Sequence, residues 1–461
     1  MVGFLRFMGW LAGQSAFFCR GIVAMLPNPL RLLGWKAYER QLLTFRLPAG
    51  GLALANDLAI VDVVLKSSRM EFPKSAYLAA VLRPLIGNGV FGQAGGVAVK
   101  AKRKAYFLAL ANVPDQEIDR VSRELSRVYV QRWIASESGT PLPRELSRLT
   151  IDIVTETLFG ARFTEADSIE FAHAFFAFNQ RASPFLLLCT RGDHASVQRL
   201  VDNMELRSIG DSLRGMIRAR FIDPWLSRDG VTLEGDRPGF PYFYRLVIED
   251  ACSQPGAMVS GAELAERLLD EVAVMVLAGH ETTASALGWL FWELAARGSG
   301  DEGNLPGREG LSAEHIDSLI NEALRLYPPI AFYLRDVAED TEFREKKLAA
   351  GSSIAISPWT IHRHRGFWDD AERFCPARWL SKDKEKQGCG DAHSRKNVFI
   401  PFGGGSRVCP GRHFAEIEMR AIVGEILRSA SFSRLPGPDP RPLGMLTTRP
   451  DFDFELAFKR I

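Results

Sequence analysis

One cysteine stands in a loop that suits it to bind a metal ion. Cys409 follows the run Phe402–Val408 (FGGGSRV) and precedes Pro410 and Gly411. The glycines let the backbone approach a large flat ligand and turn N–H groups towards the sulfur. A helical pattern begins after Gly411, so the sulfur lies at a helix N-terminus, where the dipole favours a thiolate. A thiolate below an iron centre donates charge that promotes cleavage of an O–O bond above it.

The loop has two other possible interpretations. A lone cysteine is more often a buried structural residue than a ligand. A phosphate-binding glycine loop does not fit, because no Lys-Ser or Lys-Thr pair follows and the glycines do not have the GxGxxG spacing. Metal binding by Cys409 therefore needs support from elsewhere in the chain.

A second group of chemically capable residues lies in the middle of a long apolar helix. Ala278 and the glycine after it leave room for a diatomic ligand, and the Thr282 hydroxyl can bond the Ala278 carbonyl one turn back. The carboxylate of Glu281 can relay protons through water. A buried polar cluster that only kinks a core helix remains the alternative. A zinc site is excluded, because no second histidine follows His280 at the HExxH spacing.

The helix that carries this group is expected at residues 260–297. Ser260 and Glu263 form an S-x-x-E capping box at its start. At 1.5 Å per residue the helix is roughly 55 Å long. A polar cluster in the middle of a membrane span would be costly, so the pattern favours a helix buried in a protein core.

The cysteine loop resembles the F-x-x-G-x-R-x-C-x-G signature of the cytochrome P450 superfamily at every defined position. Phe402, Gly405, Arg407, Cys409 and Gly411 supply the match. The resemblance implies that Cys409 is the axial ligand of a haem iron and that Arg407 contacts a haem propionate. It also places Phe402 and Gly411 beside the cofactor.

The long helix carries a second signature of the same family. Residues 278–283 (AGHETT) are similar to its A-G-x-[DE]-T-T motif without departure. The resemblance implies that Ala278 lies beside the haem and that Thr282 and Glu281 are catalytic, delivering protons to iron-bound oxygen.

Two further elements support the resemblance and are expected to be structural. Glu322 and Arg325 have the family's E-x-x-R spacing on one helix face, although such a pair taken alone is usually a surface ion pair. Arg378 lies in Pro376–Trp379, which looks like the family's P-x-R-F element with Trp379 in place of Phe. These residues are expected to hold the cysteine loop in place.

Two more arginines are expected at the haem. Arg335 follows a proline turn, where the family commonly has a propionate-binding arginine. Arg103 corresponds to the arginine of a W/H-x-x-x-R pattern after a glycine-rich loop at 87–91, but Val99 stands at the Trp/His position. The alternative for Arg103 is a solvated basic face shared with Lys100, Lys102 and Lys104.

The fold class expected is mainly α with small β-sheets (α+β), the cytochrome P450 fold with a long central helix over the haem. Residues 1–461 are expected to form one haem-thiolate domain, with an amphipathic segment at 1–35 and the cysteine loop and its helix at 398–428. Strand-like runs lie at 52–55, 351–356 and 453–458.

The resemblance implies a monooxygenase that holds haem b and uses O₂, with NAD(P)H electrons arriving through a separate ferredoxin- or flavodoxin-type protein. Basic residues at 381–397 could dock that partner or form an ordinary solvated loop. The substrate is expected to be a small apolar molecule such as a fatty acid, terpenoid or steroid-like compound. Its pocket is expected to contain Val274, Ala278, Ile330 and Phe332, with the phenylalanine-rich span 171–188 as wall or core.

Composition bounds the remaining possibilities. With 57 Lys+Arg against 55 Asp+Glu, the charge is too balanced for a nucleic-acid binder that relies on phosphate neutralisation. Six scattered cysteines argue against a disulfide scaffold and for a reducing compartment. The expected location is the cytoplasm, with membrane contact at most peripheral through the N-terminus.

Two other functions remain open on the sequence. The same scaffold can host a peroxygenase, dehydratase or isomerase that does not use O₂. A haem sensor without catalysis is the more distant alternative.

Overall fold

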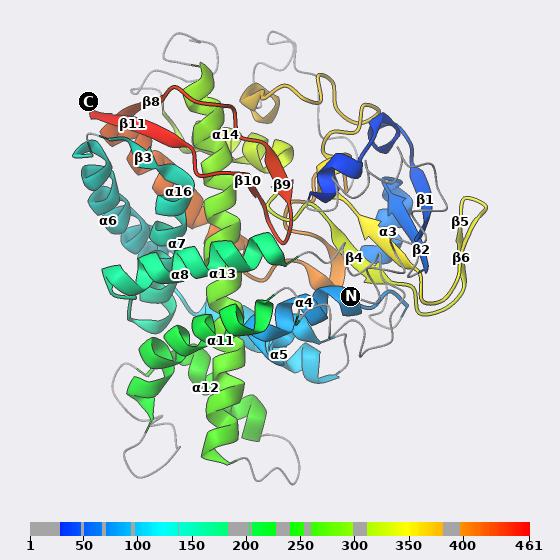
Figure 1. Cartoon of the computed structure of the whole chain (residues 1–461), viewed down its shortest axis with the longest axis horizontal. Helices are drawn as coiled ribbons and strands as arrows, with labels where there is room; N and C mark the ends of the chain where they lie inside the picture. Colours follow the sequence, from blue (N-terminus) through cyan, green and yellow to red (C-terminus); the bar gives the residue numbers. More distant parts are fainter. Residues whose placement is uncertain are drawn as a thin grey trace.

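The computed structural model describes residues 28–461 except 48–49, 67–70, 94–96, 137, 183–201, 203–204, 227–239, 253–259, 298–310 and 381–396. Most of the amphipathic segment expected at 1–35, and of the basic run at 381–397, lies outside the described residues. Figure 1 shows a large helical part beside a smaller part that holds the strands β1, β2 and β4.

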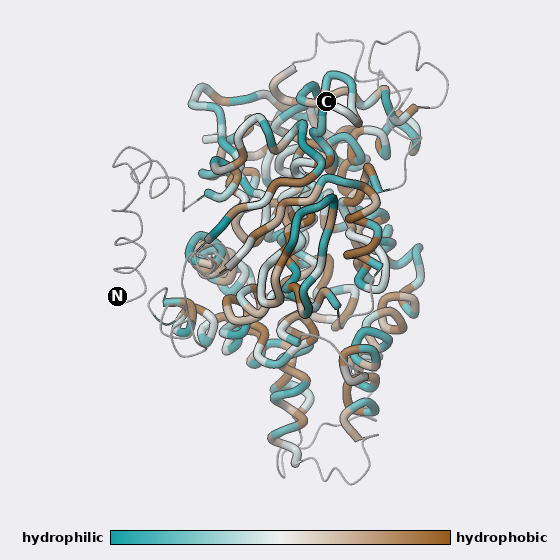
Figure 2. The backbone as a smooth tube through the Cα atoms, turned by 90° about the vertical axis from the view of Figure 1, so that its right-hand side faces the viewer, coloured by the Kyte–Doolittle hydropathy of each residue, from teal (hydrophilic) through white to brown (hydrophobic). Residues whose placement is uncertain are grey.

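Helices make up most of the described chain, which confirms the predicted fold class. Their bounds are α3 Leu58–Lys66, α4 Ala76–Ile86, α5 Val97–Ala111, α6 Asp115–Ile134, α7 Leu142–Phe159, α8 Glu165–Arg181, α11 Leu206–Ile217, α12 Tyr242–Cys252, α13 Gly261–Arg297, α14 Ala313–Leu326, α15 Pro358–Ile361 and α16 Arg412–Ser429. Figure 2 shows polar and apolar stretches alternating along the helices, as expected where each helix buries one face.

The central helix α13 begins and ends close to where the sequence predicts. The Glu263 N–H donates to the Ser260 hydroxyl at 3.2 Å, the first half of the predicted capping box. In Figure 1, α13 runs through the middle of the molecule, and it packs against α7, α14 and α16. Val274 and Trp289 are buried on it, so the apolar run forms the protein core.

Four strands form the larger sheet, in the order β1-β2-β7-β4: β1 Leu42–Leu47, β2 Gly50–Ala55, β7 Ser353–Ile356 and β4 Tyr333–Asp336. A second sheet contains β3 Thr140–Pro141, β11 Glu455–Arg460 and β8 Ala430–Arg434, and β5 Thr341–Phe343 pairs with β6 Lys346–Leu348. The three strand-like runs of the sequence therefore fall on β2, β7 and β11.

A short hairpin, β9 Pro442–Gly444 and β10 Thr448–Pro450, joins the two parts. On one side, the Ser285 hydroxyl of α13 donates to the Thr448 carbonyl. On the other side, the Asn28 amide donates to the Pro442 carbonyl at 2.8 Å, and the Gly444 N–H donates to the Asn28 Oδ1 at 3.1 Å. Residues far apart in the chain thus fix the hairpin from both sides.

The cysteines depart from the sequence expectation. Cys375 is disulfide-bonded, whereas Cys252 and Cys409 are free. Pairing depends on which Cβ atoms meet in the folded chain, and scattered spacing does not encode that. The cysteine pattern therefore no longer supports a reducing compartment. Separately, none of the helices in the described part of the chain combines the length and apolar character that a bilayer crossing requires.

Candidate active site

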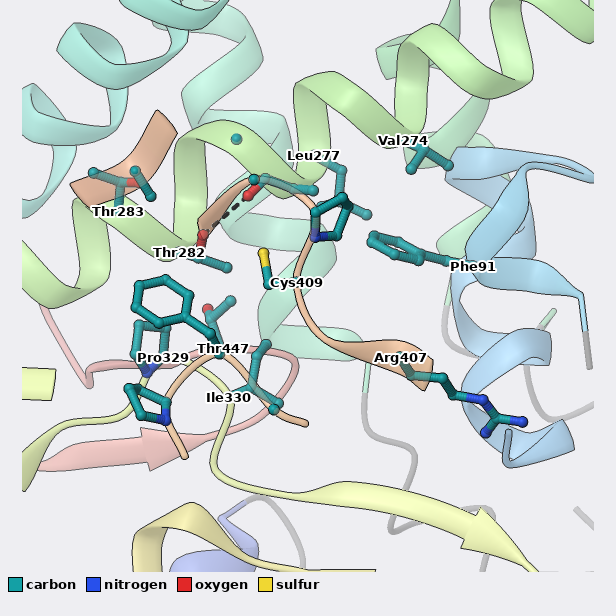
Figure 3. Close-up of a pocket in the computed structure, with 18 of the residues that line it drawn as sticks. Phe91, Val274, Leu277, Thr282, Thr283, Pro329, Ile330, Arg407, Cys409 and Thr447 are labelled. Atoms are coloured by element: carbon teal, nitrogen blue, oxygen red, sulfur yellow. Dashed lines mark hydrogen bonds between the residues drawn. The ribbon is translucent and has the colours of Figure 1, made fainter. Parts of the chain in front are cut away.

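A cavity of about 370 Å³ lies between α13 and the cysteine loop, and its walls are mostly apolar (Figure 3). Nearly all of the site residues predicted from the sequence line it. These are Arg103, Val274, Ala278, Thr282, Ile330, Phe332, Arg335, Phe402, Arg407, Cys409 and Gly411. The carboxylate of Glu281 is not part of the wall.

The cysteine loop is held by its own backbone. The Cys409 N–H donates to the Phe402 carbonyl at 2.9 Å, and this hydrogen bond closes the loop formed by residues 403–408. Gly405 has a φ of 61°, and a side chain there would collide with the Leu65 carbonyl of α3. Only glycine combines this left-handed backbone with such a close approach. The helix α16 begins three residues after Cys409, so the sulfur lies near its N-terminus as predicted.

The electrostatics of the thiol differ from the sequence expectation. Burial raises the pKa of the Cys409 thiol, whereas the Gly411 N–H and the charge of Arg103 lower it without reversing the direction. The helix end alone therefore does not create a thiolate. A coordinated metal ion deprotonates a thiol outright, so a metal ion bound here would hold Cys409 as the thiolate.

Three arginines lie at the cavity wall, and two of them, Arg103 and Arg335, are buried. Arg103 donates to the Val408 carbonyl at 2.8 Å, and Arg407 donates to the Phe72 carbonyl at 3.2 Å. The Nε atom of Arg335 is buried without a hydrogen-bond partner, and burial lowers the pKa of this guanidinium to about 10. An orphaned buried donor of this kind fits an anionic group such as a carboxylate.

The α5 region settles one question left by the sequence. Arg103 is buried and lines the cavity, so it does not lie on a solvated basic face. Val99 is buried in the apolar cluster around α5. It therefore supplies packing, and no polar contact replaces that of the usual Trp or His. Together, the free thiol, the arginines and the apolar walls fit a flat ring system that carries acidic groups.

Glu322 is the centre of a fully buried charge network behind the loop. Arg325 donates to it twice, at 2.9 and 2.8 Å, and Arg378 donates at 3.1 Å. The Trp379 indole N–H donates at 2.9 Å, and the Cys375 N–H at 2.7 Å. Burial raises the pKa of the Glu322 carboxyl, but these donors outweigh it and lower the pKa. Trp379 thus adds a donor that the usual Phe would lack.

Two residues that the sequence did not single out connect this network to the loop. The His362 ring contacts the Arg325 carbonyl at 3.2 Å and accepts from the Ile400 N–H at 2.9 Å. Burial lowers the pKa of His362 to about 3, so the ring stays neutral. The Tyr333 hydroxyl lies 3.0 Å from the Ile400 carbonyl. In the sequence, His362 is marked only by a His/Arg-rich run at 362–365, and no motif with a fixed spacing includes that run.

On the opposite wall, α13 presents the hydroxyl of Thr282. It donates to the Ala278 carbonyl at 2.9 Å, as predicted, and Figure 3 shows it near Cys409. A Cβ added to Gly279 would lie 2.8 Å from Val154 of α7, so a glycine keeps the helices close there. Thr282 and Thr283 line the cavity, so part of the polar cluster of α13 belongs to the site.

Glu281 points away from the position the sequence suggested. Its Oε1 accepts from Asn179 of α8 at 3.2 Å and from Thr447 of the hairpin turn at 3.0 Å, and Arg449 lies 3.5 Å away. The carboxylate is buried in this network, so it does not face the cavity beside Thr282. Helical spacing sets the direction in which a side chain leaves the backbone. The position of its end group depends on contacts with other elements.

A second carboxyl in the wall was also missed. Glu418 of α16 is fully buried and accepts from the Thr283 hydroxyl at 3.3 Å, while its Oε1 has no hydrogen-bond partner. Burial raises the pKa of this carboxyl well above its usual range. It follows the cysteine by nine positions in an otherwise amphipathic helix, and nothing in that pattern distinguishes it from a solvent-facing residue.

The phenylalanine-rich span is largely core. Only Phe175 of this span reaches the cavity among the described residues, whereas Phe171 and Phe178 are buried in the helical cluster. The Phe171 and Phe175 rings meet the His280 ring edge-on. Phe185 lies outside the described residues. Core packing, one of the two readings of the sequence, thus accounts for most of this aromatic content.

Comparison with known proteins gives a family and several relatives. A family model described as Cytochrome P450 matches residues 314–452. The chain is 26% identical to protein LUTEIN DEFICIENT 5, chloroplastic, of Arabidopsis thaliana, over 86% of this chain and 68% of the relative. It is 28% identical to 11-oxo-beta-amyrin 30-oxidase of Glycyrrhiza uralensis, over 66% of this chain and 58% of the relative.

Two solved structures show the same fold. CYP175A1 from Thermus thermophilus superposes with a TM-score of 0.68 at 24% identity, covering 95% of this chain and 97% of the other. A cyanobacterial CYP120A1 with bound retinoic acid has a TM-score of 0.66 at 18% identity, covering 91% and 92%. At these identities the likeness concerns the fold alone.

Proposed function

This chain belongs to the cytochrome P450 superfamily, the haem-thiolate monooxygenases, and from that premise we propose that it inserts one oxygen atom from O₂ into an apolar organic molecule. One observation carries the proposal: the Cys409 thiol, the Thr282 hydroxyl and the Val274 side chain line the same apolar cavity.

Haem b is the cofactor that the site fits, and when bound it supplies the oxidising chemistry. Cys409 would ligate its iron, while Arg103, Arg335 and Arg407 would bind its propionates. The Glu322 network keeps the loop and its sulfur in one place. Thr282 holds a hydroxyl proton at the cavity wall, where general-acid assistance to oxygen is needed.

The substrate is proposed to be apolar, such as a fatty acid, terpenoid or steroid-like skeleton. The part of the wall above the loop is made of Leu82, Phe91, Leu277, Ile330 and Phe332. A cavity with this lining gains affinity from buried apolar area and offers few polar contacts. A relative named for 11-oxo-beta-amyrin is consistent with this class.

Electrons from NAD(P)H are proposed to arrive through a separate protein of the ferredoxin or flavodoxin type. An acidic partner would be attracted by the lysines and arginines at 381–397. Charge reversal at Lys382, Lys384 and Lys386 should slow reduction at low salt and leave ligand binding intact. Unchanged reduction kinetics would remove this docking site from the proposal.

The proposal is tested first by the spectrum of the reduced holoprotein with carbon monoxide. We expect the red-shifted Soret band of thiolate-bound iron, and we expect Cys409→Ala to abolish it. Cys252→Ala is the matched control, because Cys252 is a free and exposed cysteine.

Turnover with ¹⁸O₂ then separates a monooxygenase, which incorporates one labelled atom, from a peroxygenase, dehydratase or isomerase, which incorporates none from O₂. A haem sensor would show no ligand-induced spectral shift with apolar compounds.

A further inference from the structure

The position of Glu281 leaves a gap in the proton path of the proposed reaction. Its carboxylate is buried and does not line the cavity, whereas the Thr282 hydroxyl does. Protons that pass through Glu281 therefore need another group to reach the cavity. Among the described residues, one side chain both lines the cavity and hydrogen-bonds Glu281, namely Thr447.

Thr447 lies in the turn between β9 and β10 and is held from two sides. Its hydroxyl donates to Glu281 Oε1 at 3.0 Å and accepts from the Asn179 side-chain amide at 2.7 Å. Figure 3 shows Thr447 in the cavity wall between Thr282 and Ile330 in this view. The hydroxyl is thus placed between the carboxylate and the cavity.

Asn179 of α8 fixes the orientation of this contact. Its amide oxygen accepts from the Leu446 N–H at 3.3 Å, which leaves its NH₂ to donate to Thr447 and Glu281. Since an amide with three assigned partners cannot flip without losing them, the donor side stays on the hydroxyl. Asn179 is therefore a positioning residue for Thr447.

A charged side chain also approaches the Oε1 atom of Glu281. Arg449 Nη1 lies 3.5 Å from Glu281 Oε1, and the same guanidinium stacks over the Phe176 ring at 4.0 Å and lies 3.9 Å from Asp453. The arginine therefore balances Glu281 from behind the wall. Thr447 remains the polar contact on the cavity side.

We propose that Thr447 is the residue through which Glu281 exchanges protons with the cavity. In the ionised state of the carboxyl, the Thr447 hydroxyl donates to it, as observed. In the protonated state, the carboxyl gives its proton to the Thr447 oxygen while the hydroxyl proton passes to a cavity water, so Thr447 is unchanged. Glu281 then regains a proton from solvent. This role rests on the proposed oxygen chemistry.

The turn that carries Thr447 also shapes the cavity. Met445 and Leu446 line the wall together with Thr447. A ligand that presses on this turn therefore changes the same hydroxyl that contacts Glu281. Substrate fit and proton supply are coupled through three residues of one turn.

The test is hydrogen peroxide release per O₂ consumed by the holoprotein, reduced by a surrogate ferredoxin and its reductase. Thr447→Val keeps the shape and removes the hydroxyl, and we expect the peroxide fraction to rise about tenfold and the solvent deuterium isotope effect to change. Thr447→Ser should restore both. Thr155→Val is the matched control, because Thr155 is buried and its hydroxyl binds only carbonyls of its own helix. It should behave as wild type.

Two further measurements exclude a merely structural effect. The imidazole dissociation constant, read from the spectral shift, should stay within about twofold in Thr447→Val. The infrared carboxyl band assigned by difference against Glu281→Gln should move in Thr447→Val, because it has lost a hydrogen bond. Adding Glu281→Gln to Thr447→Val should raise the peroxide fraction no further, since both act on one path.

An unchanged peroxide fraction and isotope effect in Thr447→Val would overturn this role, as would additive effects in the double variant. The peroxide assay needs no substrate. A wild-type protein that yields no oxygenated product would therefore count against the proposed function, while the comparison of Thr447→Val with wild type would still decide the role of Thr447.

Discussion

The two walls of the cavity are built in different ways. Behind the cysteine loop, Glu322 is satisfied by residues 3 to 57 positions away, and every strong charge there is paired. On the α13 side, Glu281 is held by Asn179 and Thr447, 102 and 166 positions away. The first wall is a rigid support made of nearby segments, and the second is assembled from three distant elements. In terms of the proposed function, we infer that the loop side holds the cofactor and that the α13 side controls its chemistry.

The largest effect is expected for Glu322→Ala, which tests the support that the network provides behind the cysteine loop. It leaves Arg325 and Arg378 buried without their carboxylate, and removing one partner of a buried ion pair costs about 3–5 kcal/mol. We expect a loss of that size in urea unfolding, together with poor haem retention. Glu314→Ala, at an exposed position of the same helix, should cost at most about 1 kcal/mol. Equal losses in both variants would contradict the support role.

Thr282→Val tests the opposite wall. It removes the hydroxyl at the cavity surface, and loss of a general acid–base group lowers turnover roughly a hundredfold. Stability and haem content should stay close to wild type, in contrast to Glu322→Ala. The measurements are product formed per NAD(P)H and the unfolding midpoint. A Thr282→Val variant with a lower unfolding midpoint but normal turnover would contradict the catalytic role of this wall.

The acid sensitivity of the loop side follows from His362. Burial lowers its pKa to about 3, below the ordinary 6.5, so under acid the unfolded chain takes up a proton that the folded chain refuses. The contribution of His362 to the free energy of unfolding is fully present above pH 6.5. It is lost as the pH falls towards 3, by about 1.4 kcal/mol per pH unit. Urea unfolding at pH 7 and pH 5 should show a shallower decline in His362→Asn than in wild type. The exposed His173→Asn should leave the slope unchanged.

Trp379→Phe has the smallest expected effect. It restores the residue usual in the family but removes the indole N–H that donates to Glu322 at 2.9 Å. A hydrogen bond to a charged group contributes about 1.5 kcal/mol, so unfolding should shift by that amount with normal haem retention. Trp35→Phe, at an exposed tryptophan, is the control and should be neutral. No shift would mean that the other donors of the network compensate fully.

The same contrast explains what the sequence could predict. Cys409, Arg407, Glu322 and Arg325 belong to motifs with fixed local spacing, and their positions follow from helices and turns that short patterns encode. The four-stranded sheet was visible only as isolated runs, because strand pairing between β2 and β7 joins segments about 300 positions apart. Its order could not be derived.

The residues that were missed are captured by tertiary contacts. Glu281 was assigned correctly to α13, but its direction depends on Thr447 and Asn179, which carry no motif. The Cys375 disulfide and the buried Glu418 are of the same kind, because pairing and burial arise only when distant elements meet. Arg103 shows the reverse case, where burial decided between two readings that spacing had left open.

Asn28 has a practical meaning for anyone who trims the N-terminus to improve expression. Its side chain makes two hydrogen bonds to β9, the first strand of the hairpin whose turn borders the cavity, and Leu30 packs against Gly444. Deletions that reach into residues 28–30 should loosen that turn and change which compounds are accepted, although they remove nothing from the cavity itself.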